Sequence, residues 1–166
     1  MPPFFAQSPE DMPTPEDFSG RSGLEFMQDQ LAGKLSGAPM AETLNFRLID
    51  VADGQVTFEG VPQFNATNPM SGVHGGWYGA LLDSVMGCAV MTKVPKGRIY
   101  TTLEYKVNIT RGLKVGPRVQ ATAFVDHTGH STIVGHGEIR DPSDGRLYAA
   151  GTTTCLVMDA PVLGQH

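Results

Sequence analysis

One segment, residues 75–92, constrains the fold of this chain more than any other. It reads GGWYGALLDSVMGCAVMT, which is long enough for about five helical turns, and Asp83 is its only charged residue. A helix that is apolar on nearly all sides has to be buried. Burial of an unpaired carboxylate costs several kcal/mol or raises its pKa. We therefore expect a buried central helix in which Asp83 is the reactive group.

The segments around this helix predict a sheet. Alternating residues on both sides of Asp53-Gly54 predict a hairpin of strands 44–51 and 55–61. Four further β-rich segments follow the helix, at about 99–109, 117–127, 131–141 and 146–158. Their short connections favour a run of antiparallel neighbours. The expected fold class is α+β, with a six-stranded antiparallel sheet wrapped around the long central helix.

The N-terminal part divides into two further segments. Residues 1–20 contain five prolines and several acidic residues, which predicts a flexible leader. Residues 21–40 should carry an amphipathic helix near 23–36, opened by a capping box at Ser22 and stopped at Gly37. The main domain then spans 41–160.

Composition and charge exclude several classes of function. With 40% hydrophobic and 17% charged residues among 166, the chain suits one compact domain. A net charge of −5 gives no electrostatic footprint for a polyanion, which argues against nucleic acid as a main partner. The N-terminus lacks the pattern of a signal peptide and Asp83 disfavours a membrane span, so we expect a cytoplasmic protein with no membrane partner. Cys88 and Cys155 are expected as reduced thiols.

No metal site is expected. His127, His130 and His136 lie near a predicted hairpin turn, but no second cluster of Cys, Asp or Glu stands at a recognised ligand spacing.

The residues before and inside the central helix form a motif. Asn68-Pro69-Met70-Ser71-Gly72-Val73-His74-Gly75-Gly76 followed by Asp83 resembles the signature of PaaI-like hotdog-fold thioesterases. Residues 102–111 and 144–149 resemble the family's next strand and last hairpin, although Gly112 stands where the family commonly has proline. The similarity spans about 43–158. It implies a hotdog fold, hydrolysis of acyl-CoA without a cofactor, and a homo-oligomer, either a dimer or a dimer of dimers, with the site at the subunit interface.

The resemblance also suggests roles within the motif. Asp83 is expected to act as general base on water or as a nucleophile, and unpaired amides at the helix start are natural oxyanion donors. Gly75 is the preferred donor, with Gly76 beside it. Further candidate site residues are Asn68, His74, Thr102 with Thr101 as a register alternative, and Arg111.

Several alternatives stay open at this stage. Asp83 could be a structural residue bonded to Ser84 or to a strand. The protein could be a non-enzymic acyl-CoA-binding module, or a hotdog dehydratase or hydratase that uses His74. The cations Lys106, Arg111, Lys114 and Arg118 could contact CoA phosphates or simply be solvated, and Trp77, Tyr78 and Met86 could line an acyl pocket or belong to the core.

Overall fold

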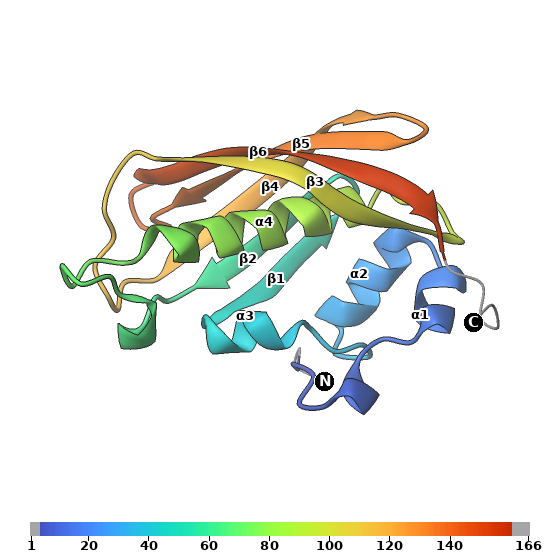
Figure 1. The fold of residues 1–166 in the computed structure, drawn as a ribbon, viewed down its shortest axis with the longest axis horizontal. Helices are drawn as coiled ribbons and strands as arrows, with labels where there is room; N and C mark the ends of the chain where they lie inside the picture. The colour runs from blue at the N-terminus through green and yellow to red at the C-terminus, as the bar shows by residue number, and fades with distance from the viewer. Residues whose placement is uncertain (1–3, 161–166) are drawn as a thin grey trace.

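A six-stranded antiparallel sheet curves around one long helix, α4 (Gly75–Met91), in the computed structural model, which describes residues 4–160 (Figure 1). The strand order is β1-β2-β4-β5-β6-β3. The strands are β1 (Phe46–Ala52), β2 (Gln55–Gly60), β3 (Arg98–Ile109), β4 (Val119–Thr128), β5 (Thr132–Arg140) and β6 (Leu147–Asp159). The predicted α+β hotdog fold is confirmed.

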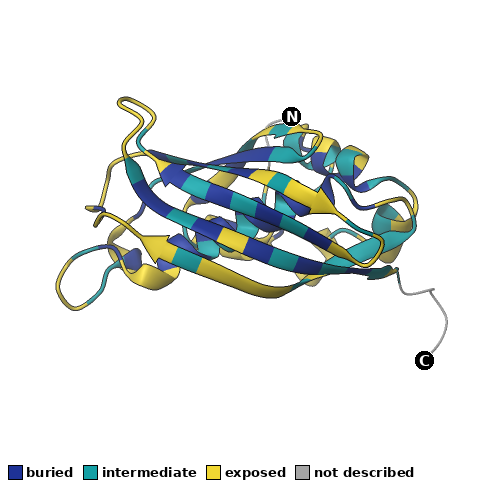
Figure 2. Ribbon diagram, turned by 90° about the horizontal axis from the view of Figure 1, so that it is seen from above, coloured by how far each residue is buried: buried dark blue, intermediate teal, exposed yellow. Residues whose placement is uncertain are grey.

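The core lies between α4 and the concave face of the sheet. Leu81, Leu82, Val85 and Met86 of the helix have almost no solvent exposure. The middle strands alternate buried and less buried positions, so that one face of each meets the helix (Figure 2). The burial of α4 follows from its apolar sequence, as expected.

The β1–β2 hairpin forms as predicted. Ala52 pairs with Gln55, which leaves a two-residue connection of Asp53 and Gly54. Gly54 has a φ of 76°, a conformation that glycine adopts without strain. The free energy cost of this tight turn is therefore small.

The prediction that the four strands after the helix pair in sequence order is wrong for one strand. β3 does not pair with β4; it pairs with β6 at the edge of the sheet, while β4 pairs with β2. Residues 110–118 are too long for a tight turn and carry the chain from the sheet edge to its middle. β3 is consequently an edge strand and is exposed along most of its length (Figure 2).

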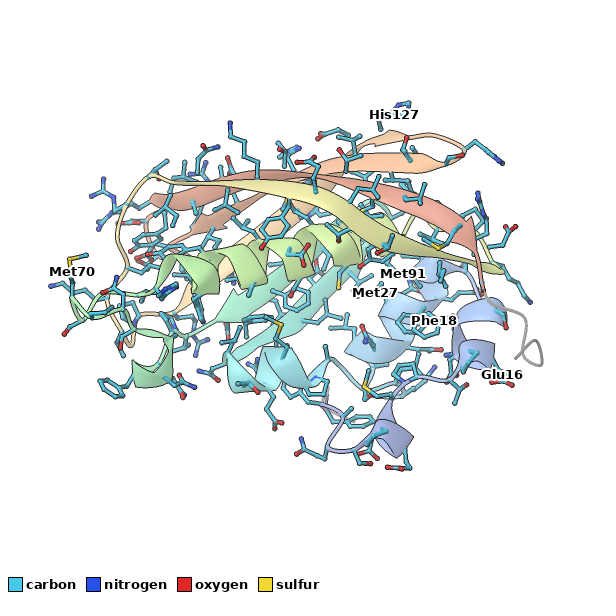
Figure 3. The ribbon with its side chains drawn as sticks, in the orientation of Figure 1. Glu16, Phe18, Met27, Met70, Met91 and His127 are labelled. Atoms are coloured by element: carbon cyan, nitrogen blue, oxygen red, sulfur yellow. The ribbon has the colours of Figure 1, made fainter. Side chains whose placement is uncertain are left out.

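The N-terminal part packs against the rest of the chain. Residues 1–20 were expected as a flexible leader; residues 1–3 lie outside the described residues, and 4–20 contain a 3-10 turn, η1 (Pro9–Asp11), and a short helix, α1 (Pro15–Ser19). The ring of Phe18 in α1 stacks on that of Phe26 in α2 (Gly23–Leu31), with centroids 4.6 Å apart. Phe18 lies with Met27 and Met91 where α1, α2 and the end of α4 meet (Figure 3).

Helix α2 is shorter than the sequence suggested. It ends at Leu31, and Gly33 follows with a φ of 71°. The Lys34 amide donates to the Asp29 carbonyl and the Gly33 amide to the Gln30 carbonyl, which is the hydrogen-bond pattern of a Schellman motif. The stop residue is therefore Gly33 and not Gly37. A separate helix, α3 (Pro39–Thr43), and a 3-10 turn, η2 (Phe64–Ala66), complete the described elements.

None of the helices within residues 4–160 combines the length and the hydropathy needed to cross a bilayer.

Candidate active site

The start of α4 presents one free backbone donor. His74 is the N-cap residue, and its Nδ1 accepts a hydrogen bond from the Gly76 amide at 2.9 Å. The Gly76 N–H is therefore already used. In the described part of the chain nothing accepts a hydrogen bond from the Gly75 N–H, which points out of the first turn of the helix. Of the two glycines singled out in the sequence, only Gly75 can offer its amide to a substrate oxygen.

His74 has a structural task. The Nδ1 lone pair is occupied by the hydrogen bond that it accepts from the Gly76 amide. The His74 amide also donates to the Ala66 carbonyl at 2.8 Å. These two bonds fix the entry to α4, and they leave Nδ1 unavailable as the base that a dehydratase would need.

Asn68 shapes the loop before the helix. Its Oδ1 accepts hydrogen bonds from the amides of Met70 at 2.9 Å and Gly72 at 3.2 Å. The loop also contains Ser71 with a φ of 63°, a conformation that such tight local bonding stabilises. The side-chain oxygen of Asn68 is thus committed to the loop, and only its amide nitrogen remains to face a substrate.

Asp83 is half-buried two turns into α4 and has one hydrogen-bond donor among the described residues. Thr102 Oγ1 on β3 donates to Asp83 Oδ1 at 3.3 Å. Burial raises the pKa of Asp83 above its ordinary value, and the Thr102 hydrogen bond partly opposes this. Thr101 is exposed, because successive strand residues point to opposite faces. Thr102 is therefore the threonine that contacts the Asp83 carboxylate. Ser84 does not hydrogen-bond to that carboxylate.

Gly75 and Asp83 are too far apart to act together within one chain. They are eight positions apart on the same helix, and a rise of 1.5 Å per residue places them roughly 12 Å apart. A base and an oxyanion donor must both lie within about 3 Å of the reacting group. A site that uses both residues needs a second chain.

A cavity of about 270 Å³ lies against Asp83 and Thr102. Most of its wall is apolar or aromatic. Much of the wall comes from the N-terminal part of the chain, which was not predicted from the sequence to lie at the site. The other lining residues are Phe4, Phe5, Gln30, Gly37, Ala38, Ala41, Arg47, Leu48, Phe58, Ser84, Cys88 and Tyr100. The Phe4-Phe5 pair, an apolar island in a proline-rich segment, was the signal that could have revealed this contact.

The aromatic residues considered for an acyl pocket belong to the core instead. Trp77 Nε1 donates to the Leu44 carbonyl at 2.8 Å, and the Tyr78 hydroxyl accepts from the Leu113 amide at 2.6 Å. Both side chains are buried, as is Met86. They hold α4 to its neighbours and do not line the cavity beside Asp83.

The candidate phosphate-binding cations differ in their surroundings. Arg118 forms an ion pair with Glu59 at 3.0 Å. Lys106, Arg111 and Lys114 are exposed, and none of them forms an ion pair with another residue of 4–160. Arg111, directly after β3, is therefore free to meet an anionic ligand.

The histidines and cysteines contribute no further reactive centre. His136 Nδ1 lies 2.7 Å from Asp126 Oδ1, and its ring stacks on Phe124. His127 lies on the β4–β5 hairpin, away from α4 (Figure 3). Within residues 4–160, no three His, Cys, Asp or Glu side chains gather as metal ligands would. Burial raises the pKa of Cys88 to about 12, so its thiol is not a nucleophile at neutral pH.

Comparison with known proteins shows which family the chain is similar to. Residues 70–148, which include the start of α4, Asp83 and β3, match the model of the thioesterase superfamily. A point mutant of the phenylacetic acid degradation protein PaaI from Thermus thermophilus is 26% identical, with 71% of this chain and 97% of that chain covered and a TM-score of 0.65. The matched segment of this chain is thus similar to the thioesterase superfamily, and the fold is PaaI-like.

Other solved structures extend the comparison. A phenylacetic acid degradation-related protein from Ralstonia eutropha JMP134 is 26% identical, covers 78% of this chain and 98% of its own, and gives a TM-score of 0.71. A hypothetical thioesterase from Streptococcus pneumoniae TIGR4, solved with coenzyme A, shares the fold at 23% identity, with 71% and 89% covered and a TM-score of 0.63. The search of curated protein sequences gave no significant match.

Proposed function

We propose that this protein hydrolyses acyl-CoA thioesters to the free acid and CoA, at a site formed by two chains. The observation that carries the proposal is the carboxylate of Asp83, held by Thr102 at the wall of a largely apolar cavity. A raised carboxylate pKa suits a general base, because proton transfer is most efficient when the pKa of the base approaches the working pH. The cavity offers an acyl group a place beside that base.

The proposed reaction uses two helix segments. Asp83 of one chain takes a proton from water, and the hydroxide oxygen bonds to the thioester carbon. The Gly75 N–H of the second chain donates to the resulting oxyanion, assisted by the positive end of α4. Collapse of this intermediate breaks the carbon–sulfur bond and releases the CoA thiolate, which takes up the proton. Asn68 and Arg111 are proposed to orient the substrate near the Gly75 end.

A nucleophilic route would use the same residues. A carboxylate oxygen of Asp83 would attack the thioester carbon and expel the thiolate, and water would then hydrolyse the mixed anhydride. Label found in the enzyme after a single turnover in ¹⁸O water identifies the nucleophilic route. Attack by water labels only the product acid, whereas anhydride hydrolysis at the carboxyl carbon of Asp83 leaves label in the enzyme.

The surface of β3 supports the proposed homo-oligomer. Three large apolar side chains on this edge strand are exposed, namely Leu103 at 57%, Tyr105 at 46% and Ile109 at 46%. An edge strand with exposed apolar side chains favours pairing with another strand. A twofold pairing of this kind is isologous and would repeat each contact, giving two equivalent sites per dimer.

Release of free thiol from a panel of acyl-CoA substrates tests the proposal. Wild type should hydrolyse at least one class, and Asp83→Asn should retain binding but lose about 10²- to 10⁴-fold in turnover. Acyl-CoA binding by wild type without thiol release would instead establish a binding module. Equal turnover in folded wild type and Asp83→Asn would show that another residue is the base.

A further inference from the structure

The N-terminal segment lines the cavity beside Asp83. Phe4, Phe5, Gly37 and Ala38 contribute to its wall, together with groups that α4 and β3 supply. All four precede the residues that match the superfamily model, which begins at Met70. This part of the wall therefore comes from residues outside the matched segment.

Backbone hydrogen bonds fix the position of this wall. The Gly37 amide donates to the Phe4 carbonyl at 2.7 Å, and the Ala6 amide donates to the Gly37 carbonyl at 3.1 Å. A Cβ at position 37 would lie 3.1 Å from Cδ1 of Phe5, so the ring packs directly on the glycine. Ala6 is buried at 1% exposure. The Phe5 ring is thereby held at one place in the cavity.

Phe5 also stands between two cavities. The cavity beside Asp83, of about 270 Å³, and a second of about 350 Å³ share only three lining residues, Phe5, Ala41 and Arg47. Ala41 has too small a side chain to divide them, and the Arg47 guanidinium is turned toward Glu59, 3.3 Å away. The phenyl ring of Phe5 is the large apolar group at this boundary.

The geometry points to Phe5 as the residue that sets the upper limit on acyl length, restricting the substrate to compact acyl groups, short, medium or aromatic. This inference rests on the proposed function, because it takes the cavity beside Asp83 as the acyl pocket. An acyl chain that enters past Asp83 and extends toward the second cavity meets the Phe5 ring. Removal of the ring would join the two cavities and admit a longer chain.

Binding of S-alkyl-CoA thioethers with chains of four to fourteen carbons, chosen as probes that cannot be hydrolysed, tests this limit. In wild type, affinity should rise with length and then level or fall. We call the chain length at which affinity stops rising the break. In Phe5→Ala the break should move to longer chains, since each newly buried methylene strengthens binding by up to about fourfold. Phe5→Trp should move it to shorter chains. Phe5→Leu, which retains apolar packing, should give a break between those of wild type and Phe5→Ala.

Phe64→Ala is the matched control. Phe64 is 85% exposed on η2 and does not line either cavity, so its removal should leave the length profile unchanged. Thermal unfolding of every variant checks that the N-terminal segment still packs. A break at the same chain length in wild type and in folded Phe5→Ala, Phe5→Leu and Phe5→Trp would overturn the inference.

The same titrations keep this inference distinct from the proposed activity. If the break moves with residue 5 while wild type releases no thiol from any acyl-CoA, Phe5 limits acyl length in a binding protein and the hydrolytic function is wrong. If thiol is released but the dependence of binding on chain length is the same in all residue 5 variants, the hydrolytic function is supported and the inference about Phe5 is wrong.

Discussion

Replacement of Gly75 by proline isolates the proposed oxyanion donor. Proline removes the N–H of this residue and nothing else that the site is proposed to use. Gly75 is the first helical residue, a position that proline favours because the lost donor has no partner inside the helix. His74 before it has φ −64° and ψ 139°, which a residue that precedes proline adopts readily. We therefore expect Gly75→Pro to fold with α4 intact.

The expected effect on turnover follows from the single free donor. The Gly76 amide is bonded to His74, so no second glycine amide at this helix start can replace the lost one. Removal of one oxyanion donor typically lowers kcat by about 10²- to 10³-fold. Stability should change little or increase by about 0.4–1 kcal/mol, because proline restricts the unfolded chain.

The assay is kcat and KM for the best acyl-CoA, with Gly75→Ala as the matched control. Alanine retains the N–H, and its Cβ would lie 3.5 Å from Cδ1 of Ile109, an ordinary contact. Gly75→Ala should thus keep turnover within a few-fold of wild type. Equal kcat for folded Gly75→Pro and Gly75→Ala would refute the reasoning that this amide stabilises the oxyanion.

Three further predictions concern the surroundings of the site. Thr102→Val removes the hydrogen bond that lowers the pKa of Asp83, so the acid limb of kcat/KM should move to higher pH; an unmoved limb would deny the contact. The native pKa of Asp83 is raised, so the native state binds this proton more tightly than the unfolded chain does. The ionised Asp83 carboxylate therefore lowers the free energy of unfolding. This loss reaches its maximum above the native pKa of Asp83 and disappears below the ordinary value of 3.8. Asp83→Asn should accordingly melt above wild type at neutral pH, with the difference vanishing in acid, as calorimetry across pH would show. Tyr78→Phe leaves the buried Leu113 amide without its acceptor, which should lower the free energy of unfolding by about 1–3 kcal/mol in urea titrations and leave kcat unchanged.

The sequence predicted the central architecture because its strongest patterns are local. The apolar run of α4, the Asp53-Gly54 turn and the four later strands each follow from spacing and turn chemistry, and all are present. The position of β3 could not be predicted in this way. Strand order depends on a connection across the sheet, residues 110–118, and neither local propensity nor hydrophobic alternation specifies where such a connection leads.

The candidate site was predictable in its residue types and less so in its contacts. Asp83 stood out because a charge in a buried helix is costly, and its partner Thr102 was one of two adjacent threonines that only the register of β3 could separate. The use of the Gly76 amide by His74 depends on one cap geometry. The cavity wall around Phe5 depends on a bridge between Phe5 and Gly37, which are distant in sequence, and no periodic pattern signals it.

Mixing of two inactive chains tests most directly whether Asp83 and Gly75 act across a subunit interface. Gly75→Pro and Asp83→Asn are each expected to be nearly inactive as homo-oligomers. If the site is shared, a hybrid dimer holds one site with both groups intact. Random reassociation of equal amounts should then restore about a quarter of wild-type turnover, because about half the dimers are hybrid and each has one complete site. A mixture that subunit exchange shows to be hybrid, yet that stays as inactive as its components, would contradict the account.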